Sequence, residues 1–327
     1  MTTPLLEVRD LVKHYRASSV LGGSSKVVHA VNGISFVVAP GETLGLVGES
    51  GCGKSTVGRT ILRLQEPSSG EVWFEGRNLF ALDPRALRAV RRRMQIVFQD
   101  PYSSLNPRLT IGASVAEGLE IHRLVPKHLV RDRVSQLLNE VGLDADMAER
   151  YPHEFSGGQR QRIGIARALA VEPAFLVCDE PVSALDVSVQ AQILNLLADL
   201  QAARGLSYLF IAHDLAVVRQ IAQRIAVMYL GFIVEMASAE SVIAHSRHPY
   251  TRALLSAVPE PDPERQRTRI VLSGDPPSPT AIPTGCPFAP RCFHPAKDAR
   301  CLSERPALRP AGDGVVACHH AELNSQP

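Results

Sequence analysis

The hydrophobic pattern of the first forty residues is typical of β-strands. Apolar and polar positions alternate in short runs between residues 4 and 40, and such alternation predicts half-buried strands joined by turns. A loop is predicted between two of these strands, from Ser18 to Lys26. Residues 43–47 (TLGLV) form a short apolar run that predicts a further strand, and a helix is expected from Lys54 to Leu64.

Apolar runs and helical patterns alternate in the middle of the chain. Asp83 and Pro84 are residue types preferred at a helix N-terminus. Residues 174–178 and 207–211 are apolar runs without polar alternation, as expected for strands buried on both faces. Because such strands alternate with helices, the pattern predicts an α/β fold with a largely parallel sheet. Helices are predicted within residues 108–150, at 163–170 and at 187–203.

The overall composition argues against several classes of protein. The 327 residues are 45% hydrophobic and 21% charged, which is ordinary for a globular chain. With 35 basic and 33 acidic residues the net charge is +2, so no long-range field favours a nucleic acid as partner. The N-terminus has no apolar signal-peptide segment, and no apolar run approaches the roughly 18–20 residues of a membrane helix. We therefore expect a cytosolic chain that serves any membrane process through partner chains.

The composition shifts near residue 258. From Pro259 to Pro327 the chain is rich in proline, arginine and cysteine and has little periodicity. We therefore predict two domains, residues 1–258 and residues 259–327, of which the second is small and irregular.

Residues 48–55 (GESGCGKS) form the first motif that carries chemistry. They match the pattern G-x-x-x-x-G-K-[ST] without a gap, between a predicted strand and a predicted helix. The glycines let backbone N–H groups close around phosphate oxygens, and the helix N-terminus adds a partial positive charge. Lys54 is expected to reach the β- and γ-phosphates, and the Ser55 hydroxyl to ligate Mg²⁺. The predicted nucleotide-binding residues are Gly48, Glu49, Ser50, Gly51, Cys52, Gly53, Lys54, Ser55 and Thr56.

Two carboxylates follow the apolar run at residues 174–178. In a sheet that carries a phosphate-binding loop, the end of this strand would place Asp179 and Glu180 beside that loop. Asp179 is then expected to help hold the Mg²⁺ shell, and Glu180 to accept a proton from the attacking water.

Residues 155–162 (FSGGQRQR) form a second glycine-rich helix start, which is again suited to phosphate. The stretch resembles the signature of the ABC ATPase family, with Phe155 where the family usually has leucine. Its core is intact and consists of Ser156, Gly157, Gly158 and Gln159. The resemblance implies a head-to-tail dimer with two ATP molecules, in which this stretch contacts the ATP held by the opposite subunit.

Further residues resemble the remaining ABC motifs in the expected order. Gln99 resembles the Q-loop glutamine, which senses Mg²⁺ and water, and Asp186 lies in a stretch that resembles the D-loop. His213 resembles the switch histidine at the γ-phosphate, and Tyr15 resembles the aromatic residue that stacks on adenine. The resemblance implies that the catalytic residues are Glu180, His213 and Gln99, and that Mg²⁺ is held by Ser55, Gln99 and Asp179.

The resemblance covers roughly residues 5–255 and implies the P-loop NTPase fold. This fold has a RecA-like α/β core, an antiparallel β-portion at the N-terminus and an inserted helical subdomain, here at about residues 100–165. The five arginines between residues 85 and 93 are interpreted as a solvated helix face, and the alternative is a docking surface for a partner.

Three stretches near the C-terminus resemble the tail of oligopeptide/dipeptide importer ATPases: residues 248–254 (HPYTRAL), 274–279 (GDPPSP) and 285–292 (GCPFAPRC). The resemblance implies a subunit that hydrolyses ATP at the cytoplasmic face of the membrane. Its partners would be a second ABC ATPase, two membrane permeases and an external substrate-binding protein. The loop at residues 18–26 looks more like the second of the two ATPases. The alternatives are an importer ATPase for nickel, an opine or a sugar, and a non-transport ABC ATPase.

Four of the six cysteines lie in this tail: Cys286, Cys292, Cys301 and Cys318. Their gaps of 5, 8 and 16 residues match no common ferredoxin or zinc-ribbon spacing. In a reducing compartment we do not expect disulfides by default. The family resemblance suggests a structural [4Fe–4S] cluster held by all four thiols. The alternatives are zinc, with His319 or His320 as substitute ligands, and free thiols in a small core.

Overall fold

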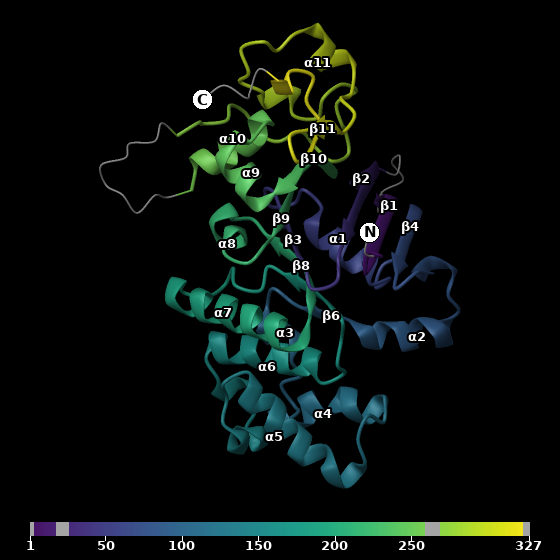
Figure 1. The fold of residues 1–327 in the computed structure, drawn as a ribbon, viewed down its shortest axis with the longest axis vertical. Coiled ribbons are helices and arrows are strands. Elements are labelled where there is room, and N and C mark those ends of the chain that lie inside the picture. The colour runs from purple at the N-terminus through teal and green to yellow at the C-terminus, as the bar shows by residue number, and fades with distance from the viewer. Residues whose placement is uncertain (1–2, 18–25, 259–268, 323–327) are drawn as a thin grey trace. The chain divides into compact units, whose positions relative to one another are not determined.

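The computed structural model describes residues 3–17, 26–258 and 269–322 (Figure 1). The loop predicted at residues 18–26 therefore lies outside the described residues, except for Lys26, where a strand begins. Within the described residues, no helix is both long enough and apolar enough to cross a membrane.

The chain divides into two compact units that each combine segments distant in sequence. Residues near the N-terminus and residues near the C-terminus belong to the same unit, unit 1. The domain division at residue 258 follows from composition alone, and it stays a prediction. Unit 1 comprises Met1–Val38, Thr43–Phe80 and Ala212–Pro327, and unit 2 comprises Ala39–Glu42 and Ala81–Ile211.

An antiparallel sheet forms the N-terminal part of unit 1. Its strand order is β2-β1-β4-β5, and Leu6 of β1 lies opposite both Val38 of β2 and Phe74 of β4. Along β2, buried and exposed side chains alternate from Ile34 to Val38, as the two-residue period of a strand requires. This sheet confirms the predicted antiparallel β-portion. The strands are β1 (Leu6–Ala17), β2 (Lys26–Val38), β4 (Ser69–Phe74) and β5 (Arg77–Asn78).

A second group of strands in unit 1 has the order β11-β12-β10-β9-β3. Strands β3 and β9 are parallel, with Leu44 opposite Arg224, and the remaining neighbours are antiparallel. All five side chains of β3 are buried, which explains its uninterrupted apolar sequence. The strands are β3 (Thr43–Val47), β9 (Arg224–Tyr229), β10 (Phe232–Ser238), β11 (Arg309–Ala311) and β12 (Gly314–Val316).

Helix α1 begins at Lys54, as predicted, but it ends at Ile61, before the predicted Leu64. The cause is Arg63, whose φ of 50° lies in the left-handed region that a right-handed helix does not enter. The helices of unit 1 are α1 (Lys54–Ile61), α8 (Leu215–Arg219), α9 (Ala239–Ala244), α10 (Pro249–Ser256) and α11 (Ala299–Ser303).

Unit 2 contains three parallel strands in the order β8-β7-β6. Phe175 of β7 lies opposite Met94 of β6 and Ser207 of β8. All side chains of β7 and β8 are buried, so the two apolar runs predicted as buried strands are confirmed. The strands are β6 (Met94–Val97), β7 (Phe175–Asp179) and β8 (Ser207–Ala212).

The helices between β6 and β7 form the inserted helical part that the resemblance implied. Figure 1 shows α4, α5 and α6 side by side, and the three helices contact one another. Outside this group, Asp83 caps α2, because its side chain accepts hydrogen bonds from the N–H groups of Arg85 and Ala86. The helices of unit 2 are α2 (Pro84–Arg93), α3 (Pro101–Ser104), α4 (Ile111–Ile121), α5 (Val130–Glu140), α6 (Gly157–Leu169) and α7 (Val187–Arg204).

Candidate active site

The predicted phosphate-binding loop joins β3 to α1 in unit 1, and two of its glycines leave no room for a side chain. A Cβ at Gly48 would lie 2.1 Å from the carbonyl oxygen of Met228, and one at Gly53 would lie 2.1 Å from that of Ala30. Gly53 also has a φ of 109°, which L side chains rarely adopt. The tight turn leads directly into α1, whose first N–H groups and partial positive charge suit a phosphate.

Lys54 is the charged group of this loop. Its side chain is only 4% exposed, and its Nζ donates hydrogen bonds to the carbonyl oxygens of Gly48 at 2.8 Å and Glu49 at 3.1 Å. These bonds hold the ammonium group inside the loop. A cation in this place offers a charge-assisted hydrogen bond to a phosphate.

The other residues of the loop differ in exposure. Ser50 and Gly51 are exposed, whereas Ser55 and Thr56 are half-buried on α1. Cys52 is buried, and burial raises the pKa of its thiol. Because only the thiolate is a strong nucleophile, this raised pKa disfavours a reactive role for Cys52.

Tyr15 on β1 was predicted to stack on adenine. Its hydroxyl donates a hydrogen bond to Oε1 of Gln65, and Nζ of Lys13 lies 4.8 Å from the centre of its ring. A cation at this distance interacts favourably with an aromatic ring. Stacking of adenine on Tyr15 stays a prediction, with Lys13 as a neighbour of the ring.

Asp179 and Glu180 end β7 in unit 2, in different environments. Asp179 is 2% exposed, whereas Glu180 is half-buried and has a left-handed φ of 48°. The N–H of Glu180 donates to the Ile211 carbonyl at 3.0 Å, and its own carbonyl accepts a hydrogen bond from the Ser183 hydroxyl at 3.1 Å. A non-glycine residue held in this conformation costs about 1–3 kcal/mol, and such strain concentrates at functional sites.

The Gln99 side chain contacts the carboxylate of Glu180. Its Nε2 donates a hydrogen bond of 3.0 Å to Oε2 of Glu180. The two residues follow β6 and β7, which are neighbouring parallel strands, so their ends meet at one edge of the sheet. An amide donor beside a carboxylate acceptor has the groups needed to hold a water and take its proton.

The predicted signature residues start α6. The Ser156 hydroxyl accepts a hydrogen bond from the Gln159 N–H at 3.3 Å, and the Gln159 side chain accepts one from the Ser156 N–H at 3.0 Å. This reciprocal pair is a capping box. A Cβ at Gly158 would lie 2.4 Å from Cγ1 of Val189, so the Val189 side chain would have to shift to admit one. Ser156 and Gly157 are exposed, so the helix N-terminus is open to a ligand.

Asp186 and His213 are both exposed. Asp186 precedes α7 as its N-cap residue, without a side-chain cap bond. His213 directly follows β8. Their roles toward ATP stay predictions.

The four cysteines predicted to bind a cluster line one cavity of unit 1. All are free thiols. Burial raises the pKa of Cys286 and of Cys318 to about 11, and it also raises that of Cys292. We call this cavity the cysteine chamber. Its cysteine and histidine residues are Cys286, Cys292, Cys301, Cys318, His248, His294, His319 and His320.

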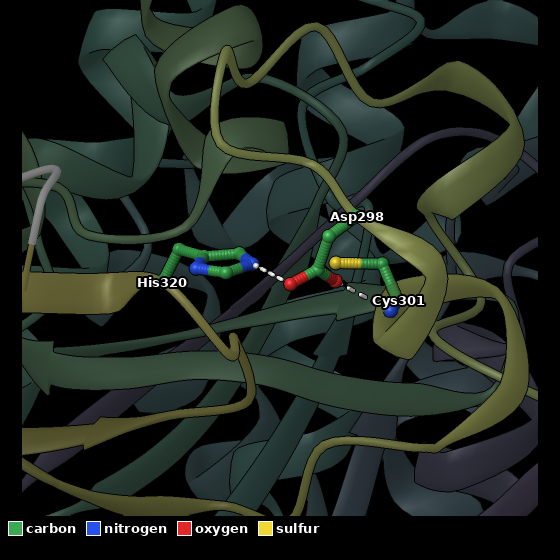
Figure 2. A group of neighbouring side chains, drawn as sticks. All are labelled: Asp298, Cys301 and His320. Carbon is green, nitrogen blue, oxygen red and sulfur yellow. Dashed lines mark hydrogen bonds and ion pairs between the residues drawn. The ribbon is translucent and has the colours of Figure 1, made fainter.

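Figure 2 shows two chamber residues, Cys301 and His320, together with Asp298, and the possible ligand atoms of the three lie within 4.8 Å of one another. Nε2 of His320 lies 3.4 Å from Oδ2 of Asp298, and the Cys301 N–H donates to Oδ1 of Asp298 at 3.2 Å. In the part of the chain that the structure describes, no other three possible ligands are this close. The four cysteine sulfurs are therefore spread more widely than thiolates around one tetrahedral zinc, which lie about 3.8 Å apart.

Two residues outside the predicted set contact the phosphate-binding loop. The Glu49 N–H donates to the Tyr250 hydroxyl at 2.8 Å, and Nη1 of Arg291 donates to both carboxylate oxygens of Glu49, at 3.1 and 2.8 Å. Neither residue has a sequence signal for this contact, because 201 and 242 positions separate them from Glu49.

Comparison with known proteins identifies the family. A family model described as "ABC transporter" matches residues 31–183, and one described as "oligopeptide/dipeptide transporter, C-terminal region" matches residues 234–301. The chain is 52% identical to the putative oligopeptide transport ATP-binding protein YkfD of Bacillus subtilis over 320 residues, covering 97% of this chain and 95% of the relative. The chain belongs to the oligopeptide/dipeptide family of ABC transporter ATP-binding subunits.

This ABC ATPase is similar to other known proteins over most of its length. It is 46% identical to the dipeptide transport ATP-binding protein DppF of Escherichia coli, over 99% of this chain and 96% of the relative. Two solved structures share its fold with a TM-score of 0.63. One is cbiO1 of Clostridium perfringens, part of the ABC transporter complex cbiONQ, at 27% identity over 74% of this chain and 91% of that one. The other is the dimeric ATP-binding cassette MJ0796 with ADP and phosphate, at 28% identity over 72% and 98%. The predicted family and fold are thereby confirmed.

Proposed function

We propose that this ABC ATPase binds Mg²⁺ and ATP through residues 48–56 and hydrolyses the ATP with Glu180 as the general base. The observation that carries the proposal is the 3.0 Å hydrogen bond from Gln99 to Glu180, whose backbone is held in a strained conformation. Ser55 and Asp179 complete the proposed site as Mg²⁺ ligands, together with Gln99.

Hydrolysis of ATP depends mainly on the positioning of the attacking water and on the stabilisation of phosphate charge, and it requires no covalent intermediate with the protein. Water attacks the γ-phosphorus, its proton passes to the Glu180 carboxylate, and the bond to the β–γ bridging oxygen breaks to leave ADP and phosphate. Gln99 holds the water beside Glu180. Lys54 neutralises charge on the β- and γ-phosphates, and His213 contacts the γ-phosphate. Tyr15 stacks on the adenine.

The signature residues act on an ATP held by a second ABC ATPase subunit. The open N-terminus of α6 at Ser156 and Gly157 supports this role, since helix N-termini favour phosphate. The similar cassette MJ0796, solved as a dimer with ADP and phosphate, supports a dimeric arrangement. Binding of ATP across the interface closes the dimer, and hydrolysis reopens it. Asp186 lies in the stretch that resembles the D-loop.

The cargo of the transporter is a dipeptide or oligopeptide. The family of the C-terminal region and the names of two similar relatives support this cargo. The subunit works at the cytoplasmic face of the membrane with two permeases and an external binding protein. The alternative is an importer for nickel, an opine or a sugar. An uptake assay with each cargo distinguishes this alternative from a peptide importer.

The cysteine chamber holds a structural [4Fe–4S] cluster. Four free thiols that line one cavity supply the donor set of such a cluster, and their sulfurs are more widely spaced than one zinc ion requires. The raised thiol pKa values mean that binding must release protons, which makes loading dependent on pH. When bound, the cluster would cross-link a region that has little apolar core of its own. The group of Asp298, Cys301 and His320 makes zinc the second candidate.

The substitution Glu180→Gln tests the proposed hydrolysis directly. It preserves shape and removes the base, so we expect ATP affinity within about twofold of wild type and a kcat reduced at least ~100-fold. Glu172→Gln, an exposed glutamate of the same unit, should leave kcat unchanged. Hydrolysis by Glu180→Gln at the wild-type rate would rule out Glu180 as the base.

A further inference from the structure

Every polar group of Glu49, the second residue of the phosphate-binding loop, has a partner. Its carbonyl accepts from Lys54 Nζ at 3.1 Å within the loop. Its N–H donates to the Tyr250 hydroxyl at 2.8 Å, and its carboxylate accepts from Arg291 at 2.8 and 3.1 Å. Tyr250 and Arg291 both lie in the region matched by the C-terminal transporter model. The conformation of the loop at Glu49 is therefore fixed from outside the loop.

Both outside partners are themselves rigidly placed. Tyr250 is fully buried, and Arg291 is 9% exposed at the end of a short 3₁₀ helix at residues 289–291. Their positions are linked by Phe288, whose ring centre lies 5.4 Å from that of Tyr250 and 5.3 Å from that of Tyr229. A guanidinium buried to this degree is costly without an anionic partner, so its contact with Glu49 is strongly favoured.

The segment that carries Arg291 is also a wall of the cysteine chamber. Arg291 directly precedes Cys292, and Phe288 and Ala289 line the chamber together with Cys286 and Cys292. Within this segment the N–H of Ala289 donates to the Cys286 carbonyl at 3.0 Å, and the N–H of Cys292 donates to the Ala289 carbonyl at 3.3 Å. A displacement of the backbone at Cys286 or Cys292 would therefore also displace the short helix that carries Arg291.

We propose that Arg291 and Tyr250 are positioning residues for ATP binding, through which the C-terminal region presets the phosphate-binding loop. Because Arg291 and Tyr250 hold Glu49 in place, the loop that contains Lys54 is ordered before the nucleotide binds. This order lowers the conformational entropy that ATP binding would otherwise cost. Occupancy of the cysteine chamber then tunes ATP affinity through Arg291. This last step rests on the proposed metal site, whereas the role of Arg291 and Tyr250 does not.

The test is a double-mutant cycle of Arg291→Ala and Glu49→Ala in the full chain, assembled with its transporter partners. Each single substitution should raise the Kd and KM for ATP about fivefold to tenfold and leave kcat within about twofold, because binding rather than chemistry is affected. The double variant should be no worse than either single one. Arg300→Ala, which removes an exposed pair with Glu304 in the same region, is the matched control and should change nothing.

Conservative variants separate positioning from a loss of folding. Arg291→Lys keeps the positive charge but loses the two-pronged guanidinium group that can bind both carboxylate oxygens of Glu49. Its ATP affinity should therefore lie between those of Arg291→Ala and the wild type. Tyr250→Phe removes only the hydroxyl that accepts from Glu49, and it should raise the Kd for ATP about threefold with normal metal content. Wild-type ATP affinity in Arg291→Ala, or additive effects of Arg291→Ala and Glu49→Ala, would overturn the proposal.

The chamber is tested by removing its metal with a chelator under reducing conditions and titrating ATP again. The wild-type Kd for ATP should rise into the range of Arg291→Ala, whereas that of the double variant should not change. An unchanged wild-type Kd after metal loss would contradict the coupling to the chamber and leave the role of Arg291 standing. If the purified chain contains no bound metal, the proposed cluster is contradicted. The double-mutant cycle of Arg291→Ala and Glu49→Ala would still test whether Arg291 positions the loop for ATP binding.

Discussion

Nε2 of Gln99 donates a 3.0 Å hydrogen bond to Oε2 of Glu180, at the ends of the neighbouring parallel strands β6 and β7. The bond joins the amide proposed to hold water to the carboxylate proposed to deprotonate it. Gln99 begins the inserted helical part of unit 2, since α3 follows it in the chain. A movement of that part would therefore change the surroundings of the proposed general base.

Replacing Gln99 should affect the rate of hydrolysis more than the binding of ATP. For Gln99→Ala we expect kcat to fall about tenfold to a hundredfold and KM for ATP to stay within about threefold of wild type. Steady-state ATPase assays on the assembled transporter measure both constants. Gln136→Ala removes an exposed glutamine from α5 and should be silent. A rise in KM with unchanged kcat would show that Gln99 contributes to ATP binding and not to water activation.

The strain at Glu180 predicts that the protein gains stability when it loses this residue. Because glycine adopts a φ near 48° without strain, Glu180→Gly should raise the free energy of unfolding by about 1 kcal/mol while it abolishes hydrolysis. Urea denaturation and ATPase assays measure the two effects.

Glu172 provides a matched control for this prediction. Its φ of 55° is also left-handed, and its carboxylate lies 3.8 and 3.6 Å from Arg92 and Arg133 in partly exposed ion pairs. Such pairs contribute about 0–1 kcal/mol, so Glu172→Gly should be neutral or slightly stabilising and keep full activity. If Glu180→Gly instead lowers the urea midpoint, the Glu180 backbone stores no strain.

Ser156 should have a role in subunit association beyond its role as a helix cap. Ser156→Ala and Asp83→Ala each remove a side-chain N-cap, at α6 and α2, so each should cost about 1 kcal/mol of stability. Only Ser156→Ala should weaken ATP-dependent association with the second ATPase subunit. Sedimentation with and without ATP measures this association. Equal association in the two variants would argue against contact between Ser156 and the partner's ATP.

The cysteine chamber predicts a coloured protein when it is purified without oxygen. We expect about four irons and matching sulfide per chain, with visible absorption that Cys301→Ser removes. Cys178→Ala is the control, because Cys178 is buried in β7 outside the chamber and should not affect iron content. About one zinc without iron would assign the site to the group of Asp298, Cys301 and His320. A colourless protein without metal would contradict the cluster and leave the ATPase assignment intact.

Features that depend on neighbouring residues in the sequence could be predicted before the structure was known. The loop at residues 48–55 is contiguous in the sequence, so its glycines and Lys54 predict both a tight turn and a bound phosphate. The cap at Asp83 and the start of α6 at Ser156 depend on side chains that bond within three positions. The uninterrupted apolar runs of β7 and β8 reflect burial on both faces.

Features that depend on distant residues had no such signal. The contact between Glu49 and Arg291 joins positions 242 residues apart, and nothing near either residue predicts it. The end of α1 at Ile61 depends on the left-handed backbone of Arg63, a type of residue that commonly continues a helix. The spacing of the tail cysteines gave no recognised metal motif, whereas the fold of the C-terminal region brings them to one cavity.

ATP-driven uptake tests the central claim, that this chain powers the import of peptides by hydrolysing ATP at Glu180. The complete transporter, with its permeases, second ATPase and binding protein, is placed in vesicles with ATP on the side of the ATPases, and accumulation of a labelled dipeptide is measured. We expect uptake with the wild-type chain and an uptake rate reduced at least ~100-fold with Glu180→Gln, although that variant still assembles and binds ATP. Peptide uptake by Glu180→Gln at the wild-type rate, or transport of nickel, an opine or a sugar in place of peptide by the wild type, would contradict the claim.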